Sequence, residues 1–194
     1  SGPKQPNVTT PARDSASGQW AAPFVMAGIN TKVVHRSHAL LGRPWGDGFL
    51  YDEAMLTGGG PLGAVSAGAV TAGLGGLMGL VAFGPTRSLV GRFLPDPGEG
   101  PSPEAQEAGF FDLRFFGTTA DGRSITTKVT GDRDPGYGST AKMLAESATT
   151  LLATNRGEKQ GAPGGFWTPA TAMGDRLIDA LEAHAGLTFE ELDD

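Results

Sequence analysis

The stretch "GFFDLRFFGTTADGRSITTKVTG", residues 109–131, decides the fold of this chain. On each side of a central turn, apolar side chains alternate with polar ones, which is typical of a strand with one buried face. Asp121-Gly122 lies between the two halves, and Asp-Gly is a common hairpin turn. We therefore predict an antiparallel pair of strands. One face would carry Phe111, Leu113, Phe115, Ile125, Thr127 and Val129, and the other Asp112 and Arg114.

Two helices are predicted to cover this pair. The first spans residues 138–154, where apolar residues recur at helical spacing. The second spans 169–185 and begins at Thr168-Pro169, a capping hydroxyl followed by proline at the first helical position. The buried stripe of the second helix is expected to be Met173, Leu177, Ile178 and Leu181. The fold class is therefore α+β, an antiparallel or mixed sheet covered by helices.

The rest of the chain is organised around this core. Residues 1–19 are rich in polar residues and proline and are expected to be a flexible lead-in. A helix is predicted over 23–41, closed by Gly42. We expect residues 20–194 to form a single domain, with an apolar Gly/Ala-rich helical insertion at about 55–92.

The insertion contains no charged residue between Ala54 and Thr86. Its centre, 63–83, exceeds the length at which an apolar helix can span a bilayer. Many of its residues are Ala and Gly, which contribute little to transfer into lipid. A buried or surface-lying helical pair, contact with a membrane surface and a true span all stay open. The lipid-contact hypothesis names Leu74, Leu77 and Leu80.

Composition excludes several classes of protein. The net charge of −6 argues against nucleic-acid binding, which needs a basic face. The chain has no cysteine, which excludes disulfides and thiolate metal sites. His35 and His38 alone are too few ligands for a metal. We expect no metal and a cytoplasmic protein, peripheral at a membrane if the apolar run contacts lipid.

Three catalytic motifs are matched only in part. Gly58, Gly60 and Gly63 fit a dinucleotide fingerprint, but "YDEAMLT" before them makes a poor strand and no acidic residue follows at the required distance. "STAK" at 139–142 has the spacing of an acyl-enzyme serine and lysine without the companion motifs. Tyr137 and Lys142 are five residues apart, one more than the short-chain reductase pair requires.

Four stretches together resemble a known family. They are "WAAPFVMAGINTKVVHRSHALLG", "LPDPGEGPSPEAQEAGFFDLRFFG", "GDRDPGYGSTAKMLAESATTLL" and "GGFWTPATAMGDRLIDAL". Their order and spacing resemble the C-terminal half of saccharopine dehydrogenase-like oxidoreductases, in the branch of the trans-acting enoyl reductases. The resemblance covers nearly everything after Gln19.

The resemblance implies a partner and a cofactor. Family members begin with a Rossmann domain that binds NADP(H) or NAD(H), and this chain lacks a match to it. We therefore expect no cofactor on this chain alone, and a missing N-terminal domain or partner chain. An acyl or lipid substrate is implied, and a homodimer is left open.

The resemblance also suggests site residues. Tyr137, in the matched "DPGYGST" motif, is the candidate proton donor, because a phenol can give up a proton to a developing enolate. Asn30, Arg36 and Ser37 are candidates for holding a carbonyl or phosphate group of the substrate. The leading function is the substrate-binding and oligomerisation half of an NAD(P)-dependent enoyl reductase. The alternative is a non-catalytic lipid- or membrane-associated binding module.

Overall fold

The computed structural model describes residues 2–86, 91, 99–157 and 164–192. The chain divides into two compact units, Ser1–Pro97 and Gly98–Asp194. Each unit combines a small antiparallel sheet with helices, so the α+β class predicted from the sequence is confirmed. The prediction of one domain from residue 20 onward is not tested by this division and stays a prediction.

The second unit is built on the predicted hairpin. Strand β4 (Phe111–Thr118) pairs antiparallel with β5 (Ser124–Gly131), and Phe111 lies opposite Gly131. Gly122 has φ +88°, the left-handed conformation that this turn needs, so the Asp-Gly prediction is confirmed. Strand β6 (Leu187–Leu192) adds to the other edge of β5, giving the order β4-β5-β6.

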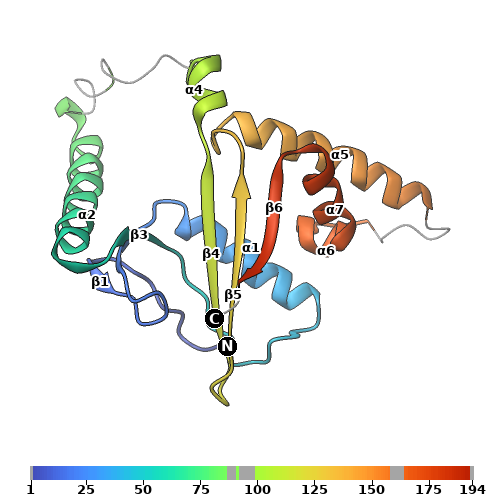
Figure 1. Cartoon of the computed structure of the whole chain (residues 1–194), viewed down its shortest axis with the longest axis horizontal. Helices are drawn as coiled ribbons and strands as arrows, with labels where there is room; N and C mark the ends of the chain where they lie inside the picture. Colours follow the sequence, from blue (N-terminus) through green and yellow to red (C-terminus); the bar gives the residue numbers. More distant parts are fainter. Residues whose placement is uncertain (1, 87–90, 92–98, 158–163, 193–194) are drawn as a thin grey trace. The chain divides into compact units, whose positions relative to one another are not determined.

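Helices cover one face of this sheet. They are α5 (Gly138–Gly157), α6 (Pro169–Met173) and α7 (Asp175–His184), whereas the short α4 (Pro103–Ala108) precedes β4. In Figure 1, α5, α6 and α7 gather on the β6 side of the sheet. The core consists of Met173, Leu177, Leu181, Ala185 and Leu187, with Phe111, Val129 and Phe189 packed against it.

The prediction of one continuous helix over 169–185 is wrong. Gly174 has φ +55° and separates α6 from α7, because its positive φ cannot continue a right-handed helix. The capping box at Thr168 confirms the predicted start. Ile178 is 38% exposed and lies outside the buried stripe in which the sequence placed it.

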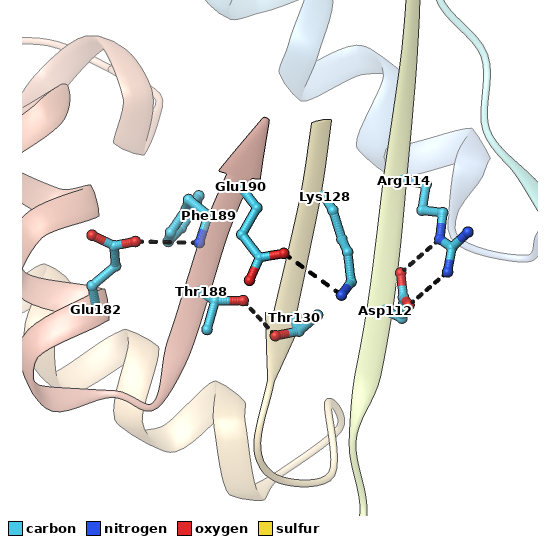
Figure 2. A network of polar contacts seen from close by, with 8 residues as sticks. All are labelled: Asp112, Arg114, Lys128, Thr130, Glu182, Thr188, Phe189 and Glu190. Carbon is cyan, nitrogen blue, oxygen red and sulfur yellow. Dashed lines mark hydrogen bonds and ion pairs between the residues drawn. The ribbon is translucent and has the colours of Figure 1, made fainter. Parts of the chain in front are cut away.

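The opposite face of the sheet is polar, as the alternation in the hairpin predicted. Figure 2 shows its side chains: Lys128 Nζ lies 3.8 Å from Glu190 Oε2, and the Thr130 and Thr188 hydroxyls are 2.6 Å apart. Arg114 pairs with Asp112 on β4. The Glu182 carboxylate accepts a hydrogen bond from the Phe189 backbone N–H and so ties α7 to β6.

The first unit contains a sheet that the sequence did not predict. Its strands are β1 (Ala12–Arg13), β2 (Trp20–Pro23) and β3 (Ala54–Gly58), paired in that order. The 1–19 segment was expected to be flexible, yet it contributes β1 and the Gln5 side chain bonds the Phe49 carbonyl.

The predicted helix over 23–41 is α1 (Ala27–Leu40), which begins later because β2 occupies residues 20–23. Its end at Gly42 is confirmed, with φ +77°. "YDEAMLT", judged a poor strand from the sequence, supplies most of β3. Pairing with β2 overrides the weak strand propensity of this segment.

The apolar insertion contains the long helix α2 (Gly60–Ala82), and residues 84–86 are helical again at the edge of the described part of the chain. Helix α2 packs on β2 and β3 only through its first turns, where Gly63 and Ala67 are buried. Figure 1 shows α2 leaving β3 and extending away from the small sheet. The expectation that the helix of the apolar insertion is buried is therefore wrong for α2. The end of the predicted insertion, 87–92, lies almost wholly outside the described residues.

Candidate functional site

The turn that leads from β5 into α5 is held by Asp134. Its Oδ2 accepts hydrogen bonds from the backbone N–H groups of Tyr137, at 2.7 Å, and Gly138, at 3.4 Å. These bonds lower the pKa of the Asp134 carboxyl, because they favour its charged form. Asp134 therefore caps α5, while the Ser139 and Thr140 hydroxyls donate to the Arg133 and Pro135 carbonyls.

Ser139 and Lys142 do not form a nucleophilic pair. Ser139 has no exposed surface, and its hydroxyl donates to the Arg133 carbonyl at 3.1 Å. Lys142 Nζ lies 2.7 Å from Asp132 Oδ1, in an ion pair at the sheet edge. The acyl-enzyme alternative is excluded, since its serine would have to be accessible to substrate.

Tyr137 connects two of the stretches that resemble the enoyl reductases, its own "DPGYGST" and "PGEGPS" before α4. A Cβ atom on Gly100, in "PGEGPS", would lie 3.3 Å from the Tyr137 ring, so the ring lies against the glycine backbone. The Asp134 N–H also donates to the Gln106 carbonyl of α4 at 2.9 Å. Tyr137 is 54% exposed, and no hydrogen bond fixes its phenol within the described residues. The structure thus presents this hydroxyl to solvent beside α4.

The three predicted substrate-binding residues lie on α1 in the first unit. Asn30 Nδ2 donates to Glu53 Oε2 at 2.9 Å, and the Ser37 hydroxyl donates to the Val33 carbonyl at 2.9 Å and is buried. Asn30 and Ser37 share a helical face, whereas Arg36 is exposed about 120° around the helix from Asn30. The three side chains therefore do not converge on one point.

A hollow beside α1 was missed by the sequence analysis. It has a volume of about 400 Å³ and is lined by Gly2, Pro3, Gln5, His35, His38, Ala39, Arg43, Asp47 and Phe49. Trp45 stacks on His38, and Phe49 meets the rings of both histidines. His38 Nε2 bonds the Gly46 carbonyl at 2.9 Å, while His38 Nδ1 and His35 Nε2 are buried without a partner.

This hollow lies against α1, although Asn30, Arg36 and Ser37 are not among its lining residues. A ring nitrogen that is buried without a partner costs free energy unless a ligand or water meets it. The sequence signal that could have found it is the pair His35 and His38, followed by the aromatic loop "PWGDGFLY". Within the described residues, no group of three ligand side chains could hold a metal ion.

Tyr51 and Glu53 form a second polar cluster with Asn30. The Tyr51 hydroxyl donates to Glu53 Oε1 at 3.1 Å, and Asn30 donates to the other oxygen of the same carboxylate. Burial raises the pKa of the Tyr51 phenol, and the Glu53 carboxylate raises it further. Tyr51 therefore stays protonated and hydrogen-bonded to Glu53, whereas no hydrogen bond fixes the Tyr137 phenol within the described residues.

The predicted lipid-contact residues lie on α2. Leu77 and Leu80 are exposed and Leu74 is half-buried. The helix is long and apolar enough to cross a membrane. It holds no charged side chain.

Comparison with known proteins adds the family context. No family model and no solved structure matches the chain. A trans-acting enoyl reductase of Mycobacterium tuberculosis is 37% identical over 177 residues, which are 88% of this chain and 42% of that protein. A second protein of that bacterium, whose name carries the same activity, is 38% identical over 177 residues, 90% of this chain and 42% of its own length.

The trans-acting enoyl reductase of Mycobacterium ulcerans is 35% identical over 169 residues, 85% of this chain and 40% of that enzyme. The chain thus spans about two fifths of the length of the curated relatives that it matches. Over nearly nine tenths of its length, the chain is homologous to part of the mycobacterial trans-acting enoyl reductases.

Proposed function

We propose that this chain is the substrate-side part of an NADPH- or NADH-dependent trans-acting enoyl reductase of the saccharopine dehydrogenase-like type. The observation that carries the proposal is the identity of 35–38% to proteins of that name along nearly the whole chain. The nucleotide-binding part would lie in the three fifths of the relatives' length that this chain does not cover.

The glycine motif at 58–63 departs from a dinucleotide fingerprint in two respects. Strand β3, the turn at Gly58–Gly60 and helix α2 follow the order of a dinucleotide fingerprint, but β3 pairs antiparallel with β2, whereas the fingerprint belongs to a parallel sheet. A Cβ on Gly63 would lie 2.1 Å from the Gly58 carbonyl oxygen, so this glycine serves helix–strand packing, as the third glycine of the fingerprint does, and does not by itself decide the question. No acidic residue follows until Asp96 to bind a ribose.

Tyr137 is the proposed proton donor. Reduction of an enoyl group leaves a carbanion or enolate that must be protonated, and a phenol can supply that proton. Tyr137 is 54% exposed, its backbone N–H donates to Asp134, and its ring lies against Gly100. A donor on a fixed turn needs little reorganisation to meet the substrate.

The hollow beside α1 is the proposed place for a polar part of the acyl substrate. The unpartnered His38 Nδ1 and His35 Nε2 could bond a carbonyl or hydroxyl group, and Phe49 supplies an apolar wall. Asn30 and Ser37 would act indirectly, since both already bond within the unit. Arg36 is exposed on α1, and its positive charge would attract an anionic group of the substrate. The lack of cysteine fits a reducing compartment, and we place the enzyme in the cytoplasm.

The experiment is reduction of an enoyl thioester by the longer protein that carries this chain, followed as NADPH oxidation. Tyr137→Phe is expected to lower kcat by about 100-fold or more, with little change in KM, because the donor is lost and binding is kept. The only other tyrosine gives the matched control, and Tyr51→Phe should leave kcat within about threefold of wild type, since it removes a bond internal to the first unit.

Equal losses in Tyr137→Phe and Tyr51→Phe would argue for a structural role of both residues. Unchanged turnover in Tyr137→Phe would remove Tyr137 from the chemistry. Absence of any NADPH- or NADH-dependent turnover by the longer protein would favour the alternative, a non-catalytic lipid-associated binding module.

A further inference from the structure

The surface of α2 is apolar and exposed. Residues 68–82 bury no side chain in the first unit, and only 6% of the most apolar window of α2 is buried. Large apolar side chains project along the helix and are exposed: Leu62, Val65, Leu77, Met78, Leu80 and Val81. An exposed apolar surface of this extent marks a contact with another apolar phase.

The helix lacks the polar face that a helix docked in a protein groove keeps toward water. Its only side chains with polar atoms are Ser66 and Thr71. The Thr71 hydroxyl donates to the Ala67 carbonyl at 2.8 Å and is satisfied inside the helix. A helix that is apolar all round fits the interior of a large protein or of a bilayer.

The end of the helix is also suited to an apolar medium. The last carbonyls of a helix have no partner inside it, and in hydrocarbon no water can meet them. Here the Thr86 hydroxyl lies 2.9 Å from the Phe83 carbonyl oxygen and also bonds the Leu80 carbonyl. This hydroxyl therefore satisfies part of the helix end without solvent.

The length decides how far the helix could enter a bilayer. The first turns are held on β2 and β3 through Gly63 and Ala67, so they stay with the protein. The remaining segment, 68–82, is about 22 Å long. The hydrocarbon core of a bilayer is about 30 Å thick, so this segment is too short to cross it.

We propose that residues 68–82 of α2 insert into the hydrocarbon of a lipid bilayer from one side, with the small β1-β2-β3 sheet held at its surface. Lipid would thus cover the exposed apolar surface of α2. The proposal does not depend on the reductase activity proposed above, because it rests on the helix alone.

Flotation of the full 194-residue chain with lipid vesicles tests the proposal. We expect the chain to float with vesicles of phosphatidylcholine alone, since the inserted segment is uncharged, and also when phosphatidylglycerol is added. Leu77→Asp combined with Leu80→Asp should lower the partition coefficient at least about tenfold. Leu144→Asp is the matched control on α5, where the side chain is 69% exposed, and should float as wild type.

Tryptophan fluorescence measures depth in the same system. Leu77→Trp should shift to the blue on adding vesicles and be quenched by lipids with brominated acyl chains, whereas Leu62→Trp, beside the sheet, should be quenched much less. The proposal is overturned if the folded chain does not float, or if the double aspartate variant floats like wild type. A helix covered by a second copy would also overturn it: the chain would then elute as a dimer and its Leu77→Trp fluorescence would not respond to brominated lipid.

Discussion

Gly63 shows how one missing side chain fixes the start of α2. Its backbone lies so close to β3 that a Cβ would sit 2.1 Å from the Gly58 carbonyl oxygen, a contact with backbone that cannot move aside easily. The Trp20 side chain would lie 3.3 Å from the same atom. The glycine therefore allows the helix to approach the small sheet closely.

Gly63→Ala is expected to destabilise the first unit by about 1–3 kcal/mol, because the added methyl must push helix and strand apart. Gly68→Ala on the same helix is the control. Its Cβ meets nothing within 4 Å, so the change should stabilise by up to about 1 kcal/mol through helix propensity. Urea unfolding measures both, and equal effects would show that the contact at Gly63 is relaxed in solution.

Asp134 makes the stability of the α5 turn depend on pH. Its pKa in the folded chain is lowered from the ordinary 3.8 by the N–H groups of Tyr137, Gly136 and Gly138. The charged carboxylate therefore stabilises the fold above its unfolded pKa, and this contribution is lost as the pH falls through the lower folded pKa.

Asp134→Asn should accordingly lower the melting temperature most at neutral pH, and the difference from wild type should fade in acid below the ordinary pKa of 3.8. Thermal unfolding followed by circular dichroism across this range measures the difference. A gap between the two proteins that is constant with pH would show that the carboxylate charge does not support the turn.

At the scale of elements, α7 supplies Leu177 and Leu181 to the core of the second unit. Leu177 and Leu181 are buried against the sheet, while Ile178, next in sequence, is 38% exposed. Leu177→Ala should cost about 2–4 kcal/mol of unfolding free energy and Ile178→Ala less than about 1 kcal/mol. Denaturant unfolding of the two variants would show the asymmetry, and similar losses would contradict this packing.

The hairpin and its covering helices could be predicted because their patterns are local. The alternation in 111–129, the Asp-Gly turn and the Thr168-Pro169 cap each act over a few residues. Strands β2 and β3 could not be predicted in this way, since neither alternates and each depends on pairing across more than thirty residues. The break at Gly174 was hidden because the apolar stripe continues through it.

At the scale of the whole molecule, the candidate site was predicted only in part. Tyr137 could be singled out because its motif is contiguous, and Gly100, which the ring touches, belongs to the other specific motif. The hollow beside α1 depends on a loop folding back so that Trp45 and Phe49 surround His38. The histidine pair and the aromatic loop after it mark this region in the sequence, but their spacing does not specify that the loop folds back onto the helix.

The proposed separation of nucleotide binding from substrate binding also concerns the whole molecule. The chain matches about two fifths of its relatives' length, and the strand before its Gly58–Gly60 turn belongs to an antiparallel pair, unlike that of a dinucleotide fingerprint. Nucleotide binding and substrate handling would then reside in different parts of one enzyme. Activity would require both parts.

Calorimetric titration of NADPH into two proteins, the 194-residue chain and the longer protein that carries it, tests this division most directly. The chain alone is expected to show no saturable binding, and the longer protein to bind one NADPH per polypeptide. Stoichiometric binding of NADPH by the 194-residue chain alone would contradict the assignment of this chain to the substrate side.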